Sequence, residues 1–115
     1  THVRAAVIGA TGFTSEQDAQ IAQHARRIAI VKAGNFSLGV NLLLALVEQA
    51  AQRLGPDWDI DVFEAHHRHK IDAPSGTALM IGEAAAQGRG AGLAELRAAS
   101  YETTSGARRP GAIGF

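Results

Sequence analysis

Residues 64–78 hold a dense group of titratable side chains. The segment reads Glu-Ala-His-His-Arg-His-Lys-Ile-Asp-Ala-Pro-Ser-Gly-Thr-Ala and contains three of the five histidines in the chain. His66 is suited to donate a proton near neutral pH, and Lys70 can pair with a carboxylate or protonate a developing anion. On an extended segment His66 and His67 point to opposite sides, so we expect them to have different roles.

The second half of the segment has the composition of a helix start. Pro74-Ser75-Gly76-Thr77 offers backbone N–H groups, the positive end of a helix dipole and two hydroxyls. Such a helix start binds phosphate or carboxylate, although an ordinary capped helix is the simpler interpretation of these four residues taken alone. The cations a few residues earlier favour an anion site, because α/β proteins bind ligands where strand ends meet helix starts.

Two other kinds of site fit the segment less well. Zinc could be bound by His66, His67 and His69, but adjacent histidines on opposite faces of a strand make a poor tetrahedral set, so we predict no metal. A nucleic-acid site needs more Arg and Lys with interleaved aromatic residues than the chain provides, so we predict no nucleic-acid partner.

Composition narrows the class of protein. The eleven basic and eleven acidic residues balance, so any anion binding must be local. There is no Cys, which excludes disulfides and thiolate nucleophiles and is typical of a cytoplasmic protein. The apolar runs are shorter than the ~20 residues that span a bilayer, and the first residues do not resemble a signal peptide. We therefore expect a cytoplasmic protein without a membrane partner.

Strands and helices alternate around this segment. β-branched or alternating apolar runs predict strands over residues 3–8, 28–31, 59–65 and 112–115. The first strand should be buried on both faces of a parallel sheet. Helical periodicity predicts one helix that is capped by Thr14 with Gln17 or by Ser15 with Asp18, a long helix that ends at Gly55-Pro56, and a third from Ser75 to Gly88. Residues 89–110 should be loop, with a short strand near 98–101.

The titratable segment closely resembles the signature of the bacterial dihydrodipicolinate reductase family of the lysine and diaminopimelate pathway. Three other segments are similar to family elements: Val7–Phe13, Asn35–Asn41 and Arg109–Phe115. The resemblance covers essentially the whole chain. It implies an α/β fold in which residues 1–36 end a Rossmann-like dinucleotide-binding domain. Residues 37–115 would be part of an α+β domain, with a mixed sheet, that binds substrate and forms a homotetramer.

The same resemblance implies an activity and a set of site residues. The reaction is hydride transfer from NADPH or NADH to a dihydrodipicolinate-type cyclic imine that carries two carboxylates. His66 would be the acid/base residue and Lys70 the second catalytic group. The substrate contacts would be His67, Ser75, Gly76, Thr77 and Thr11, and the cofactor contacts would be Gly9, Ala10, Thr11, Ala33, Gly34, Asn35 and Phe36.

The sequence departs from the family pattern in places. Ala10 stands where Thr is common, and Lys32-Ala33-Gly34 replaces a more apolar stretch. The chain also contains no G-x-G-x-x-G dinucleotide fingerprint. We therefore expect an internal fragment with uncovered apolar surfaces, which binds NADPH weakly or not at all. The alternative function is a catalytically incomplete module for anion binding or oligomerisation.

Overall fold

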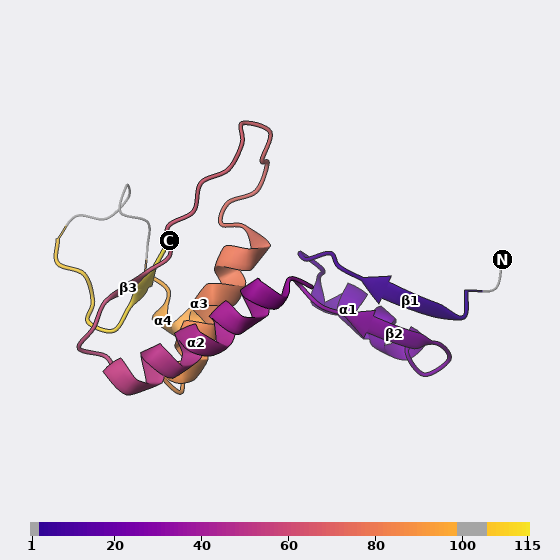
Figure 1. Cartoon of the computed structure of the whole chain (residues 1–115), viewed down its shortest axis with the longest axis horizontal. Coiled ribbons are helices and arrows are strands. Elements are labelled where there is room, and N and C mark those ends of the chain that lie inside the picture. Colours follow the sequence, from indigo (N-terminus) through magenta and orange to yellow (C-terminus); the bar gives the residue numbers. More distant parts are fainter. Residues whose placement is uncertain (1–2, 99–105) are drawn as a thin grey trace. The chain divides into compact units, whose positions relative to one another are not determined.

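The computed structural model describes residues 3–98 and 106–115, and it confirms an α/β fold. The chain divides into two compact units, Thr1–Ser37 and Leu38–Phe115 (Figure 1). The assignment of the two parts to a dinucleotide-binding and a substrate-binding domain stays a prediction. No helix within the described ranges is both long enough and apolar enough to span a membrane.

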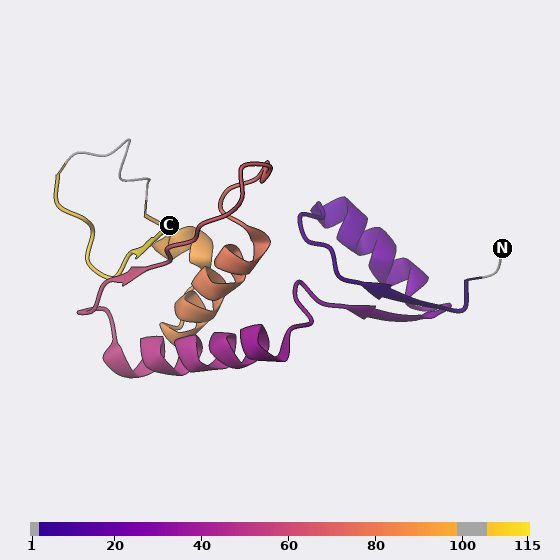
Figure 2. The same cartoon turned by 45° about the horizontal axis from the view of Figure 1, so that its top comes forward.

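The first unit is a strand, helix, strand motif. It consists of β1 (Ala5–Ile8), α1 (Ser15–His24) and β2 (Ala29–Lys32), and the two strands pair in parallel. Figure 2 shows α1 along one side of the strand pair. Of the two caps predicted for α1, Thr14 with Gln17 forms. The Thr14 hydroxyl accepts the Gln17 N–H at 3.3 Å, and the Gln17 side-chain oxygen accepts the Thr14 N–H at 2.8 Å.

The prediction that β1 is buried on both faces is wrong for this chain. Val7 of β1 is 73% exposed, and Val31 of β2 is 55% exposed. Along β1, exposed residues alternate with half-buried ones. The reason is that, in the described part of this unit, α1 alone packs on the strand pair and covers one of its faces. Uncovered apolar strand surface was expected, and it is observed here.

The second unit is built around two helices that pack against each other, α2 (Leu38–Leu54) and α3 (Gly76–Gly88). A Cβ atom added at Gly88 would lie 2.2 Å from the backbone oxygen of Glu48, so the two backbones approach closely where α3 ends. The buried core beside this contact consists of Ala51, Ala85, Ala86 and Ile113. The apolar stripe of α2 is only partly covered, with Leu42 59% and Leu46 54% exposed.

Two short parallel strands, β3 (Ile60–Asp61) and β4 (Ile113–Gly114), complete this core. Arg108 joins them: its guanidinium donates to the Asp61 carboxylate at 2.8 and 2.9 Å, and to the backbone oxygens of Ile60 at 2.6 Å and Ala112 at 2.7 Å. This arrangement anchors the strand from which the titratable segment departs.

Four expectations for this unit need correction or remain open. The strand predicted over 59–65 is shorter, because its last bond to β4 is the Val62 N–H on the Gly114 oxygen at 3.0 Å. Helix α4 (Leu93–Leu96) lies in the stretch predicted as loop. The sequence did not predict it because four residues are too few to show helical periodicity. Of the strand near 98–101, Ala98 donates to the Ile113 oxygen at 2.8 Å, and the rest lies outside the described residues. The described strand pairs are all parallel, so a mixed sheet stays a prediction.

Candidate functional site

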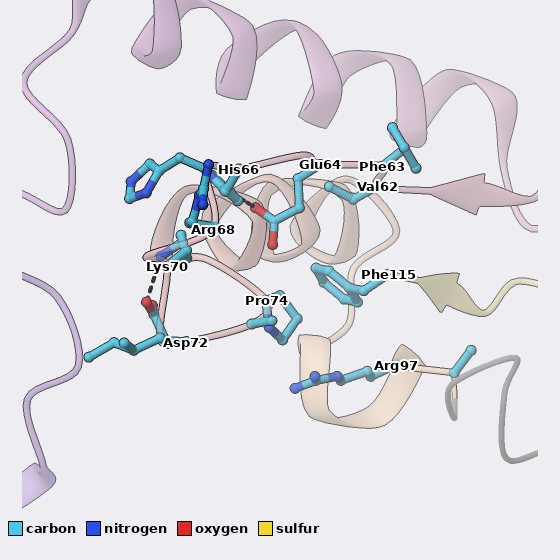
Figure 3. A pocket seen from close by; sticks show the side chains of 14 residues that line it. Val62, Phe63, Glu64, His66, Arg68, Lys70, Asp72, Pro74, Arg97 and Phe115 are labelled. Atoms are coloured by element: carbon cyan, nitrogen blue, oxygen red, sulfur yellow. Dashed lines mark hydrogen bonds and ion pairs between the residues drawn. The ribbon is translucent and has the colours of Figure 1, made fainter.

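The titratable segment forms most of the wall of an open cavity of about 840 Å³ in the second unit (Figure 3). The segment reaches it directly from β3, and the end of β4 and the residues after α4 complete the wall. The lining residues are Val62, Phe63, Glu64, His66, His67, Arg68, Lys70, Ile71, Asp72, Ala73, Pro74, Arg97, Ala98 and Phe115.

The cavity wall carries more basic than acidic side chains. Two histidines, two arginines and one lysine line it, against the two carboxylates of Glu64 and Asp72. Each carboxylate is already bonded to a basic group, Glu64 to His66 and Asp72 to Lys70. Among the described residues, Arg68 and Arg97 form no ion pair. The cavity therefore suits an anionic ligand.

Glu64 connects His66 to the start of α3. One Glu64 oxygen lies 2.8 Å from His66 Nε2 and also accepts the Ser75 hydroxyl, and the other accepts the Ser75 N–H at 2.7 Å. The hydrogen bonds from Ser75 and His66 lower the pKa of Glu64 to about 2. Glu64 is therefore ionised at neutral pH, with its side chain 24% exposed.

Lys70 is held in a second ion pair on the same wall. Its ammonium group lies 2.6 Å from the Asp72 carboxylate, and the Lys70 side chain is 22% exposed. The hydrogen bond from Lys70 lowers the pKa of Asp72 below its usual value. Figure 3 shows both pairs, Glu64 with His66 and Lys70 with Asp72, at the cavity. The structure thus brings His66 and Lys70, which the resemblance implies as catalytic, to one cavity.

The helix start predicted at Ser75 is confirmed. Ser75 is the N-cap of α3 and is buried, and its hydroxyl accepts the Ala78 N–H at 3.1 Å. Gly76 and Thr77 are the first two residues of the helix and are half-buried. Both Ser75 donors are bonded to Glu64, so direct binding of a substrate carboxylate by Ser75 requires that Glu64 release at least one of them.

The expectation that His66 and His67 point to opposite sides, and so have different roles, stays a prediction. The chain is irregular from Val62 to His67, and both residues are among those that line the cavity. His67 is fixed by a local contact in which its Nδ1 accepts the His69 N–H at 3.2 Å, and the two rings are 6.0 Å apart. Across residues 3–98 and 106–115, no three His, Asp or Glu side chains are grouped so that they could hold a metal ion.

The predicted cofactor residues meet within the first unit. Gly9–Thr11 follows β1 and Ala33–Phe36 follows β2, and because the strands are parallel both loops leave the same edge of the sheet. The Ala33 N–H donates to the Ile8 oxygen at 3.1 Å. A Cβ atom added at Gly9 would lie 3.4 Å from the ring of Phe36, whose residue is 53% exposed. Thr11 lies on the first of these loops and is also exposed.

Sequence reasoning assigned no site role to Glu64, Asp72, Arg97 or Phe115. A signal existed for Glu64 and Asp72, because each stands two residues from a basic site residue. Arg97 and Phe115 reach the cavity wall through tertiary structure, and the Arg97 guanidinium lies 5.1 Å from the centre of the Phe115 ring. Phe115 ends a segment that resembles a family element, but neither residue has a local pattern that indicates a place in this cavity.

Comparison with known families adds independent information about the whole chain. Residues 39–115 match the family model described as dihydrodipicolinate reductase, C-terminus, and residues 1–36 match the model described as dihydrodipicolinate reductase, N-terminus. The chain belongs to the dihydrodipicolinate reductase family. The resemblance found from the titratable segment is thereby confirmed, and the site residues named above lie within the matched ranges.

Several members of the family are similar over nearly all of this chain. A 4-hydroxy-tetrahydrodipicolinate reductase of Parvibaculum lavamentivorans is 58% identical over 109 residues, which are 95% of this chain and 40% of the relative. The corresponding protein of Caulobacter vibrioides is 58% identical over 112 residues, which are 96% of this chain and 44% of the relative. That of Brucella abortus is 56% identical over 110 residues, 95% of this chain and 41% of the relative. The chain thus spans about two fifths of the length of these relatives.

Proposed function

We propose that this chain forms the proton-donating and carboxylate-binding part of a 4-hydroxy-tetrahydrodipicolinate reductase. The enzyme would be a cytoplasmic homotetramer of lysine and diaminopimelate biosynthesis. Relatives of that name support the proposal, since they match at 55–58% identity over 95% or more of the chain. The observation that carries it is the presence of His66 and Lys70 on the wall of one cationic cavity. The substrate is a small dicarboxylate, which that charge suits.

The residues of the first unit fit the nicotinamide end of NADPH or NADH. Gly9–Thr11 and Ala33–Phe36 meet at the carboxyl edge of two parallel strands, where dinucleotides bind in α/β proteins. The exposed ring of Phe36 beside the Gly9 backbone offers an apolar surface to a flat ring. When bound, the cofactor supplies a hydride to the unsaturated ring of the substrate.

Three groups in the second unit would act on the substrate. His66 donates the proton that completes the reduction, which suits a histidine near neutral pH. Lys70 pairs with one substrate carboxylate and exchanges its present partner Asp72 for it. The first turn of α3 binds the other carboxylate at the positive end of the helix dipole, through Gly76, Thr77 and the one Ser75 donor that Glu64 releases, while the other Ser75 donor stays on Glu64. His67 contacts the substrate from the same wall, and Thr11 does so from the first unit.

A chimera tests this function in a full-length protein. The chain replaces its matching 112-residue segment in the Caulobacter vibrioides reductase, and NADPH oxidation with the cyclic substrate is followed. We expect turnover by the chimera, and a roughly 10²- to 10⁴-fold loss of kcat in His66→Gln, as for removal of a general acid. Lys70→Ala should raise KM and lower kcat, because it removes a carboxylate partner. His69→Gln, on the same segment but outside the cavity lining, should leave both constants unchanged.

Two outcomes would contradict the proposal. Near-normal turnover in both His66→Gln and Lys70→Ala would show that these residues do not perform the chemistry. A chimera that binds pyridine dicarboxylate with no turnover would instead support the alternative, an anion-binding module. The cavity lies entirely in the second unit, which is the feature that favours this alternative.

A further inference from the structure

We propose that Glu64 is a positioning residue, which holds His66 in one tautomer and one orientation and ties it to the first turn of α3. The inference rests on the proposed function, because it assigns Glu64 a part in the same proton transfer. The inference adds Glu64 to the site as a residue that affects the reaction only through the side chain of His66.

The geometry of Glu64 is that of a bridge. Both of its oxygens are used: one contacts His66 Nε2 at 2.8 Å and the Ser75 hydroxyl, and the other accepts the Ser75 N–H at 2.7 Å. Ser75 is 7% exposed and caps α3, so this end of the bridge is fixed in the fold. His66 lies in an irregular segment, with its side chain 38% exposed, and the Glu64 contact is the hydrogen bond seen on its ring.

An ionised carboxylate can only accept hydrogen bonds. The low pKa of Glu64, about 2, keeps it ionised wherever the enzyme would work. His66 Nε2 must therefore carry the hydrogen in this contact, which leaves Nδ1 as the nitrogen that binds and releases the catalytic proton. The other charged groups on the cavity wall are Arg68, Arg97 and the Lys70–Asp72 pair, and none of these is hydrogen-bonded to the His66 ring.

The Glu64 bridge also connects proton donation by His66 with carboxylate binding at the start of α3. The proton donor and the helix start that binds a carboxylate are joined through a single side chain, so a substrate anchored at α3 meets an imidazole of fixed orientation. The same contacts define a competing role for Glu64, in which it occupies the Ser75 donors and competes with the substrate. The two roles predict opposite effects of its removal, because a competitor's loss lowers KM whereas a positioning residue's loss lowers kcat.

A double-mutant cycle in the chimera tests the proposal. Glu64→Gln keeps the size of the side chain and removes the charge, and we expect a fall in kcat of roughly 10- to 100-fold, by analogy with partners that orient a metal-binding histidine. In a His66→Gln background the same substitution should have no further effect on kcat. Glu83→Gln, the same change at an exposed position of α3, is the matched control and should leave kcat unchanged.

Folding must be separated from positioning. KM for NADPH and the thermal midpoint are measured for each variant, and Ser75→Ala serves as a second probe, because it removes one bond to Glu64 while the contact with His66 remains. If Glu64→Gln fails to fold, Ser75→Ala should still lower kcat by several-fold, and this loss should also vanish in the His66→Gln background.

Three results would overturn the inference. They are an undiminished kcat in Glu64→Gln, an equal effect of that substitution with and without His66, and a lower KM for the dicarboxylate substrate with kcat preserved. Each of these leaves the proposed function standing as long as His66→Gln itself is impaired. A His66→Gln variant of normal activity would instead refute the proposed function.

Discussion

The two units of this chain differ in what holds their functional residues in place. In the first unit none of the described residues is buried, whereas the second holds every buried residue identified in the described chain. The loops proposed for the cofactor follow two paired strands, and their bonds include the backbone bond from Ala33 to Ile8 and the Ser37 N–H on the Asn35 side chain at 2.8 Å. The cavity residues are fixed by side-chain hydrogen bonds around Glu64 and Ser75. Stability and site geometry are therefore linked in the second unit much more than in the first.

The largest effect should come from the close approach of α2 and α3. An added methyl group at Gly88 would lie 2.2 Å from the Glu48 backbone oxygen, which cannot move without shifting α2. We expect Gly88→Ala to reduce the free energy of unfolding of the second unit by about 3 kcal/mol, the upper range for overpacking. Urea titration followed by the fluorescence of Trp58, the single tryptophan, measures this loss.

Gly92→Ala is the matched control, because no atom lies within 4 Å of a Cβ added there and its φ is −87°. Because Gly92 is the N-cap of the short helix α4, the substitution should cost about 1 kcal/mol or less, well below the cost of Gly88→Ala. Equal losses in the two variants would show that the α2–α3 contact is not the basis of this unit's stability.

The N-caps of α1 and α3 should differ in how much they contribute to stability, by less than the effect of Gly88→Ala. Ser75 is buried, and its hydroxyl donates to Glu64 and accepts the Ala78 N–H, while Thr14 caps α1 in an exposed position. We expect Ser75→Ala to cost about 2 kcal/mol and Thr14→Ala about 1 kcal/mol or less, at the two ends of the range for N-caps. Hydrogen exchange in the first turns of α3 and α1 measures both. A loss of stability in Thr14→Ala equal to or larger than that in Ser75→Ala would contradict the claim that side-chain bonds matter more in the second unit.

A further expected effect in the second unit is a dependence of stability on acid pH. Hydrogen bonds from Ser75 and His66 lower the pKa of Glu64 from 4.5 to about 2 in the folded chain. A carboxylate whose pKa is lowered by folding stabilises the folded chain at any pH above the pKa that it has in the unfolded chain. This contribution is lost as the pH falls from about 4.5 to about 2. Urea midpoints reported by Trp58 should therefore fall across that range in the unsubstituted chain.

Glu64→Gln should flatten this dependence, because the side chain no longer titrates. The lowered pKa of Asp72 acts in the same direction and should remain in that variant. An unchanged slope in Glu64→Gln would show that the Glu64 bridge contributes nothing to the stability of the second unit.

Local signals in the sequence predicted α1, α2 and α3 and the helix start at Ser75 that forms one half of the site, but they did not predict α4. The Thr14 capping box, the Gly55-Pro56 stop after α2 and the Ser75 cap of α3 each depend on residues a few positions apart, and the structure has all three. The position where β3 ends depends on its partner β4, more than fifty residues later, and was not predictable. That early end places His66 and His67 in an irregular segment and brings both to the cavity. Arg97 and Phe115 join it only through tertiary structure.

The most direct test of the proposed division of labour compares one residue from each unit in the chimera. Steady-state kinetics give kcat and KM for NADPH in His66→Gln and in Phe36→Ala. We predict that His66→Gln lowers kcat by roughly 10²- to 10⁴-fold with KM for NADPH nearly unchanged. Phe36→Ala should raise KM for NADPH by about 3- to 10-fold, the cost of one lost aromatic contact, with a smaller effect on kcat. A His66→Gln variant that turns over normally, or one that loses activity only through weaker NADPH binding, would contradict the account.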